Sequence, residues 1–272
     1  MFIPRYFLDK RPKRTNGLRH QLVLKKYLLS KEKFLKNYTL RLKNYGGHNV
    51  HGHFININKT ARARKIFKFK STLYFGTYMV CALHNSSLTN NYIMRVFNIQ
   101  NYKMYYINAV KNLFVGSMFH ISPRSLFPIV GNRYPIEYMP LGSAISNILI
   151  KDKIKFVRAA GTSAIILYRK KVFTKILLNS GKTYWIKNDA LVTLGPNANS
   201  EYHLQCLGKA SRNILKGIKP HVRGVAKNPI DHPHGGGQGK TKGGRPSVTP
   251  WGVFTKGKKT KKIKKKHWFY LV

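Results

Sequence analysis

The residues with the clearest potential for chemistry lie close together near the C-terminus. Asp231 precedes His232, and Pro233 separates that histidine from His234. A carboxylate beside an imidazole can orient the ring, and an imidazole with a pKa near neutrality can transfer protons. A His-Pro-His step in extended backbone directs the two rings apart, however, and the chain has only seven acids from which to build a catalytic site. We therefore predict a structural role for both histidines.

Gly239, Lys240 and Thr241 have the order that ends a nucleotide-binding phosphate loop. That loop requires another glycine five residues before the glycine that precedes the lysine. Here that position is His234, and the residues before it are rich in proline rather than apolar. The spacing therefore argues against nucleotide hydrolysis.

A metal site is the third candidate, because His48, His51 and His53 fall within six residues. No cysteine or acid lies nearby to complete a set of ligands. Cys81 and Cys206 are far apart in the chain, so neither a disulfide framework nor a zinc site is supported. We predict that the chain binds no metal and that these histidines face phosphate or solvent.

Most of these candidates lie in a stretch of unusual composition, residues 221–262. It carries ten Lys or Arg, nine Gly and four Pro, and Asp231 is its only acid. No period of 3.6 or 2 runs through it, so it is neither an amphipathic helix nor a half-buried strand. Such a segment buries too little apolar surface to offset its ordering entropy. We therefore expect a polyanion to give it shape, with glycine leaving room for a phosphate backbone.

The composition of the whole chain favours a nucleic-acid partner. Its 272 residues include 51 Lys or Arg and seven Asp or Glu, a formal net charge of +44. A membrane surface is a weaker candidate, because the charge is not gathered on one amphipathic helix and no apolar run approaches the ~20 residues of a bilayer span. The 15 Phe and 16 Tyr are sufficient for a core. Abundant Lys, Asn, Ile, Phe and Tyr fit an AT-rich, organellar genome.

Four segments are expected along the chain. Residues 1–53 form a basic arm, in which residues 21–42 are either a helix with a basic face or an extended segment that becomes ordered on RNA. Residues 54–125 and 126–206 contain short runs of β-branched and aromatic residues with polar breaks, a pattern typical of small barrels. Residues 207–272 form a Gly- and Lys-rich extension.

The expected strands are short. In the third segment, Asn179, Ser180 and Gly181 separate the last two runs and predict a hairpin turn. The clearest runs are residues 66–70, 77–80, 92–96, 103–107, 144–150, 156–167, 172–178 and 183–186.

The basic stretch resembles the C-terminal signature of the universal large-subunit ribosomal protein two family. The match is carried by residues 222–237 (VRGVAKNPIDHPHGGG), 248–252 (VTPWG) and 255–260 (TKGKKT). Lys227 stands where the family usually has Met, and Gln238 where it often has an acid. Both departures make the stretch more basic, which is compatible with RNA binding. Shorter matches precede it at residues 158–162, 180–181, 193–195, 207–210 and 217–220.

The resemblance implies a mostly β fold, with an OB-type barrel in residues 54–125, an SH3-like barrel in residues 126–206 and long basic extensions. It implies a structural constituent of the large ribosomal subunit that binds large-subunit rRNA, supports the peptidyl-transferase region and contributes to subunit association. No cofactor is implied beyond Mg2+ held by the surrounding rRNA. The partners would be rRNA, neighbouring ribosomal proteins and the small subunit, without a membrane.

Two alternatives accompany this prediction. The chain is expected in the mitochondrial matrix, with a plastid as the alternative. A free RNA-binding or RNA-modifying factor is the alternative function, although an enzyme would need converging polar groups in a concave site.

The residues predicted to contact rRNA lie almost entirely in the extension. Prolines would stiffen it, glycines would let phosphate approach, lysines would neutralise phosphate, and the histidine rings would stack on or hydrogen-bond to RNA. Trp251 is expected either to stack on a base or to tuck against the neighbouring surface. The full set is Arg158, Arg223, Asn228, Asp231, His232, His234, Gly235, Gly236, Gly237, Lys240, Arg245, Trp251, Lys256, Lys258, Lys259, Lys261 and Lys262.

Overall fold

The computed structural model divides the chain into two compact units. The barrel unit comprises Met1–Asn44, Arg64–Lys209 and His267–Val272, and the extension unit comprises Tyr45–Ala63 and Ala210–Lys266. This grouping differs from the four consecutive segments expected above, because residues 45–63 belong with the C-terminal extension. The residues described are 8–10, 12–25, 29–32, 34–41, 45–60, 67–69, 74–86, 89–125, 127–150, 154–239, 244–257 and 270–271.

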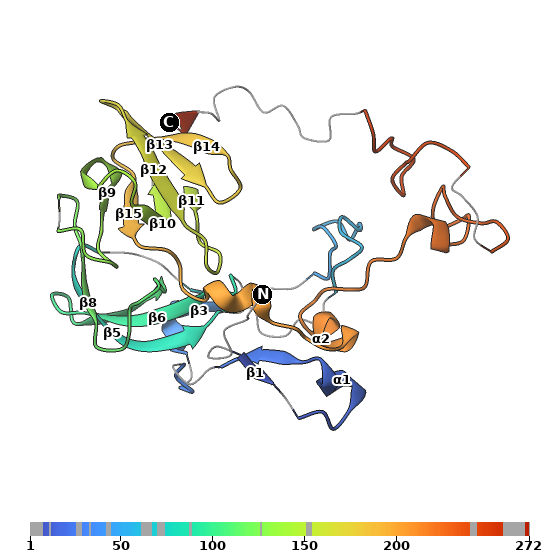
Figure 1. Cartoon of the computed structure of the whole chain (residues 1–272), viewed down its shortest axis with the longest axis horizontal. Helices are drawn as coiled ribbons and strands as arrows, with labels where there is room; N and C mark the ends of the chain where they lie inside the picture. The colour runs from blue at the N-terminus through green and yellow to red at the C-terminus, as the bar shows by residue number, and fades with distance from the viewer. Residues whose placement is uncertain are drawn as a thin grey trace. The chain divides into compact units, whose positions relative to one another are not determined.

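The first lobe of the barrel unit is an antiparallel sheet in the order β8-β5-β6-β7 (Figure 1). Buried side chains alternate along its strands, as expected for a sheet with one face in a core. Tyr78, Val80, Met94, Val96 and Tyr105 lie on that face and belong to one apolar cluster. The strands are β5 (Gly76–Asn85), β6 (Tyr92–Asn98), β7 (Lys103–Asn108) and β8 (Met118–Ile121).

The second lobe has its own apolar cluster, which includes Tyr134, Ile136, Ile145 and Ile166. The predicted hairpin turn is present, because β13 pairs with β14 and the amide of Gly181 donates to the carbonyl of Leu178 at 2.9 Å. The strands are β9 (Arg133–Pro135), β10 (Ala144–Ile150), β11 (Ile154–Phe156), β12 (Ala164–Arg169), β13 (Phe173–Leu178), β14 (Thr183–Lys187) and β15 (Leu191–Leu194).

The expected run over residues 156–167 is wrong, because it is divided between two strands. β11 ends at Phe156 and β12 begins at Ala164. Between them Val157 and Gly161 take positive φ values of 50° and 65°. This left-handed backbone turns the chain and is incompatible with a continuous strand.

The two lobes share one sheet. β8 pairs in parallel with β9 through Ile121 and Arg133, and the short β16 (Tyr270–Leu271) pairs with β14. The mostly β fold class, with an OB-type barrel followed by an SH3-like barrel, is confirmed. The remaining elements are β1 (Leu8–Lys10), α1 (Asn16–Arg19), β2 (Leu22–Leu24), η1 (Lys36–Tyr38), β3 (Thr39–Arg41), β4 (Phe67–Phe69), η2 (Ile136–Tyr138), η3 (Ser200–Leu204), α2 (Ala210–Leu215) and η4 (Gly224–Ala226).

The N-terminal arm packs on the barrel unit, and of the two alternatives for residues 21–42 the described part of that range is extended and not a helix with a basic face. β2 pairs with β1, and Leu22 exchanges two backbone hydrogen bonds with Cys206, at 3.0 and 3.1 Å. β3 pairs with β4. Tertiary pairing overrides the local helical preference here, because the alternating leucines find partners in the chain.

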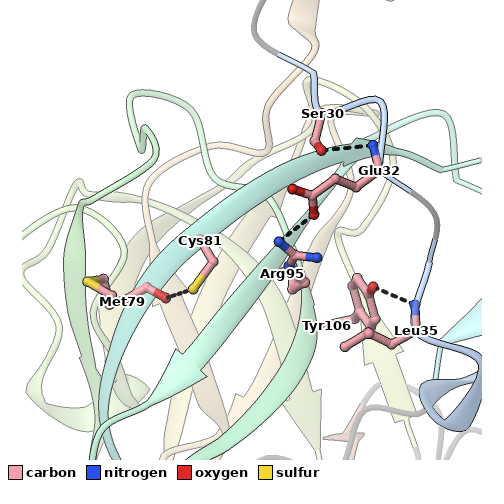
Figure 2. A network of polar contacts seen from close by, with 7 residues as sticks. All are labelled: Ser30, Glu32, Leu35, Met79, Cys81, Arg95 and Tyr106. Carbon is pink, nitrogen blue, oxygen red and sulfur yellow. Dashed lines mark hydrogen bonds and ion pairs between the residues drawn. The ribbon is translucent and has the colours of Figure 1, made fainter.

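Further along the arm, residues 29–32 and 34–35 lie on the outer face of the first lobe (Figure 2). Glu32 pairs with Arg95 at 2.6 Å, and the amide of Leu35 donates to the Tyr106 hydroxyl at 3.1 Å. His84 and Tyr106 alternate with core residues and therefore point to this outer face, yet each is only 2% exposed. The arm is what covers them.

Buried asparagine amides join the two lobes. Asn197 is fully buried, and its Nδ2 donates to the carbonyl of Val157 at 2.9 Å and to that of Thr162 at 3.1 Å. Its Oδ1 accepts from Asn91 Nδ2 at 3.2 Å. These bonds tie the loop after β11 to the loop before β6, so the lobes are held together by neutral polar groups.

We predict that Asn197→Ala lowers the free energy of unfolding by about 2–3 kcal/mol, because buried partners lose their hydrogen bonds. Guanidinium unfolding followed by circular dichroism measures the change. Asn85→Ala is the control, since Asn85 is exposed, and should cost less than about 0.5 kcal/mol. Equal unfolding midpoints for the two variants would contradict the role assigned to Asn197.

Candidate nucleic-acid interface

The signature of the extension unit, residues 223–237, folds onto itself. The amide of Asp231 donates to the carbonyl of Asn228 at 3.0 Å, and the amide of Gly236 donates to that of Lys227 at 3.1 Å. The sequence led us to expect that a partner gives this segment its shape. The structure instead shows a network of backbone hydrogen bonds within the chain, because turns closed by Pro and Gly need little apolar burial.

His232 is the centre of this signature loop. Its ring is 8% exposed and lies against Gly224, where a Cβ would come within 2.5 Å of the ring. Its Nδ1 accepts the backbone N–H of His234 at 3.0 Å, which requires that nitrogen to be unprotonated. Burial lowers the pKa of His232, and the charges of His234 and Lys227 lower it further. The ring is therefore neutral at pH 7 and carries its proton on Nε2.

At Gly235 and Gly236 of the signature, other atoms of the chain fill the space that a side chain would take. A Cβ on Gly235 would lie 2.2 Å from the carbonyl oxygen of Asn228. Gly236 has a φ of +89°, and a Cβ there would lie 2.8 Å from Cγ of Pro229. The chain itself fills the Cβ direction of Gly235 and Gly236, and the contact of phosphate with their backbone stays a prediction. Neither residue tolerates a side chain, whatever partner is bound.

His234 connects the signature loop to a second loop, residues 247–255. Its Nε2 accepts the backbone N–H of Val248 at 3.2 Å, and Val248 is only 4% exposed. Val248 forms an antiparallel bridge with Phe254. Trp251 lies at the tip of this loop and is 67% exposed. Both alternatives for its indole, stacking on a base and tucking against a neighbouring surface, stay predictions.

The other predicted contact residues divide into three groups. Arg158 is half-buried in the barrel unit, where burial lowers the pKa of its guanidinium. Five lysines lie outside the described residues: Lys240, Lys258, Lys259, Lys261 and Lys262. The exposed residues of the extension unit are Arg223, Asn228, Asp231, Gly237, Arg245 and Lys256. These exposed groups point outward from a backbone that the histidines and glycines hold in shape.

The histidines of residues 48–53 also make contacts within the chain. His48 Nδ1 lies 2.8 Å from the carbonyl oxygen of Tyr45, and its ring lies 3.9 Å from that of Phe54. Across the described ranges, no cluster of three or more His, Cys, Asp or Glu is placed to hold a metal ion. Cys81 and Cys206 are both free thiols.

The outer face of the first lobe is covered by the N-terminal arm; that this lobe is an OB-like RNA-binding barrel stays a prediction. OB barrels bind oligonucleotides on the face of their second and third strands, which here are β6 and β7. Residues 29–32 and 34–35 lie across this face and bury His84 and Tyr106. Within the part of the chain that the structure describes, no helix is long and apolar enough to cross a membrane. The exposed cations of the extension unit are therefore the candidate RNA-contacting surface.

Sequence reasoning overlooked two residues in this region, Gly224 and Val248. Gly224 lies within the quoted signature, but its contact with the ring of His232 joins residues eight positions apart. Val248 also lies within the quoted signature, but its burial accompanies a hydrogen bond to His234, fourteen positions away, which the sequence does not reveal.

Comparisons with known proteins match both halves of the chain. A family model described as "Ribosomal Proteins L2, C-terminal domain" matches residues 129–252. The chain is 34% identical over 256 residues to the large ribosomal subunit protein uL2 of Rickettsia canadensis, covering 92% of this chain and 93% of the relative. It is 34% identical over 255 residues to uL2 of Paracoccus denitrificans, covering 92% and 91%. With uL2 of Rickettsia bellii the identity is 44% over 162 residues, and the match spans 59% of that relative's length.

We predict that His232 titrates below its ordinary pKa of 6.5 and that Gly224→Ala raises its pKa toward that value. A Cβ at position 224 would displace the ring into water and remove the burial that disfavours its charged form. NMR titration of the imidazole protons measures this. Gly239→Ala is the control, because a Cβ there meets nothing within 4 Å. An unchanged His232 pKa in Gly224→Ala would contradict the packing.

The lowered pKa of His232 also predicts how the stability of the signature loop changes with pH. The unfolded segment takes up a proton on His232 near pH 6.5, and the folded loop does so only at lower pH. The contribution of His232 to stability is therefore complete above pH 6.5 and is lost as the pH falls toward the folded pKa. Amide hydrogen exchange of the signature loop should accelerate over that interval relative to barrel amides.

Proposed function

Because this chain belongs to the ribosomal protein L2 (uL2) family, we propose that it is a structural constituent of the large ribosomal subunit. The observation that carries the proposal is the match to uL2 of Rickettsia canadensis, which covers 92% of this chain and so includes both barrels and both extensions. A free RNA-binding or RNA-modifying factor is not favoured, since the relatives that match over most of the chain are large ribosomal subunit proteins.

We propose large-subunit rRNA as the partner, because the positive charge of the extension unit is suited to bind phosphate. The extension unit holds 18 Lys or Arg in 76 residues, with Asp231 as its one acid. Such a charge density repels itself and is relieved by phosphate. We propose that the exposed residues Arg223, Asn228, Asp231, Arg245 and Lys256 contact rRNA. The lysines of residues 256–266 would add phosphate contacts.

A supporting role near the peptidyl-transferase region, and contacts with neighbouring ribosomal proteins and the small subunit, are the finer parts of the proposal. The resemblance of residues 222–260 to the family signature supports them. The role would be positional and not catalytic. Nδ1 of His232 is occupied by the N–H of His234 and is therefore not oriented by Asp231 for proton transfer.

We place the protein in the mitochondrial ribosome, with the plastid ribosome as the alternative. Its richness in Lys, Asn, Ile, Phe and Tyr supports an organellar genome. Sedimentation of organelle lysates tests both the function and the location: the protein should migrate with the large subunit and be released from it by EDTA and high salt. A peak among free proteins at the top of the gradient, with the subunits intact, would overturn the proposal.

We predict that replacing Lys258, Lys259, Lys261 and Lys262 with Gln flattens the salt dependence of rRNA binding. Each phosphate contact adds about 0.7–0.9 to the slope of log K against log salt, so the slope should fall by about 3. Filter binding across a NaCl series measures it. The matched control is Arg at the same four positions, which keeps the charge and should keep the slope. A slope that Gln leaves unchanged would show that these lysines remain solvated.

A further inference from the structure

Two loops of the extension unit have the same backbone structure. We call residues 47–55 the His51 loop and residues 247–255 the Trp251 loop. Each is closed by an isolated antiparallel bridge, between His48 and Phe54 in the first and between Val248 and Phe254 in the second. Equivalent residues differ by 200 in number, so the two loops have the same length and register.

The hydrogen bonds of the two loops correspond one to one. In the His51 loop, the amide of Asn49 donates to the carbonyl of His53 at 2.9 Å, that of Gly52 to Asn49 at 3.1 Å, and that of Ile55 to Gly47 at 2.9 Å. In the Trp251 loop, the equivalent distances are 2.8, 2.9 and 3.0 Å. Two loops distant in sequence thus share one closed geometry.

The side chains that the geometry requires are also equivalent. Asn49 Oδ1 accepts the amide of His53 at 2.9 Å, and Thr249 Oγ1 accepts that of Val253 at 3.2 Å. Gly52 and Gly252 have φ values of 82° and 77°, which other residues rarely adopt. Each loop therefore requires a short side chain that accepts a hydrogen bond and a glycine three residues later. The geometry places no requirement on the side chains of the two residues between them.

Those two positions form an exposed tip. In the His51 loop they are Val50 and His51, and Val50 is 93% exposed. In the Trp251 loop they are Pro250 and Trp251, whose indole is 67% exposed. Within the described ranges, neither His51 nor Trp251 makes a side-chain hydrogen bond or a ring contact. The indole of Trp251 therefore contributes no packing contact among the described residues that would account for its place at the tip.

The residues that close each loop are held by contacts within the chain, so the tip of each loop is held on a closed backbone. The ring of His48 lies 3.9 Å from that of Phe54, and Val248 is buried and bonded to His234. Both loops belong to the unit with 18 Lys or Arg and one acid. A flat ring on a fixed stem amid cations fits an unpaired base, because the cations bind the flanking phosphates while the ring stacks.

We propose that the two loops are two copies of one RNA-docking element, in which the residue before the glycine, His51 or Trp251, stacks on an unpaired base of the rRNA. The inference rests on the proposed function and adds the two positions at which bases, and not only phosphates, are contacted. The scaffold is shared, and the ring at the tip is what distinguishes the two sites.

The test uses the full-length protein and the large-subunit rRNA transcript of Paracoccus denitrificans, with excess tRNA as competitor. Trp251→Ala and His51→Ala should each weaken binding about tenfold, and the double variant should weaken it about a hundredfold. The slope against salt should not change, because no phosphate contact is lost. His51→Trp should bind rRNA as tightly as the unaltered protein or more tightly, since a larger ring occupies the same position. Val50→Ala and Val253→Ala are controls on the same loops and should bind as the unaltered protein does.

The outcomes separate this inference from the function on which it rests. If the unaltered protein shows no salt-dependent rRNA binding, the proposed function fails. If it binds but all tip variants bind equally well, the inference fails and the function stands. Weakening by Trp251→Ala without weakening by His51→Ala would overturn the equivalence of the loops. Normal rRNA binding with failed incorporation into subunits would assign the tips to a protein partner and likewise overturn the inference.

Discussion

The chain carries 51 Lys or Arg against seven Asp or Glu, so most charged side chains have only like charges around them. Ion pairs can therefore contribute little to folding. Glu32, one of the few acids, pairs with Arg95 and joins the N-terminal arm to β6. Among the described residues, eight of the fifteen buried polar side chains are asparagines, and Arg133 is the one buried arginine or lysine. Asn91, Asn197 and Asn199 connect the lobes through side-chain hydrogen bonds, which satisfy buried groups without adding charge.

The same constraint divides the molecule into two kinds of structure. The barrel unit concentrates the apolar residues into two cores, which tolerate a basic surface. The extension unit has no comparable cluster among its described residues and is ordered by turns, glycines and the rings of His232 and His234. Its cations are consequently left on the outside, where phosphate can reach them. A neutral His232 is consistent with this arrangement, because a further positive charge within the loop would be unfavourable.

The N-terminal arm links these observations to function. By covering the outer faces of β6 and β7, residues 29–32 and 34–35 occupy the surface on which other OB barrels bind oligonucleotides. This face of the barrel is therefore occupied by the chain's own arm. The signature residues lie in the extension unit, which holds only one of the chain's seven acids.

The sequence by itself was enough for everything that depends on local chemistry and composition. Net charge, short alternating strands, the turn at Asn179–Gly181 and an irregular C-terminal signature predicted the mostly β fold and the family. Only the tertiary structure decided which partner each of these segments finds. The leucines near Leu22 are compatible with helix or strand until Cys206 supplies a pairing edge. Gly224 and Gly235 are recognisable as special, but whether phosphate, a histidine ring or a carbonyl fills the space beside them depends on residues brought together by folding. The equivalence of the His51 and Trp251 loops was hidden for the same reason, because their shared hydrogen bonds need only an acceptor and a glycine at matched positions, and so few residues leave too weak a trace in a sequence.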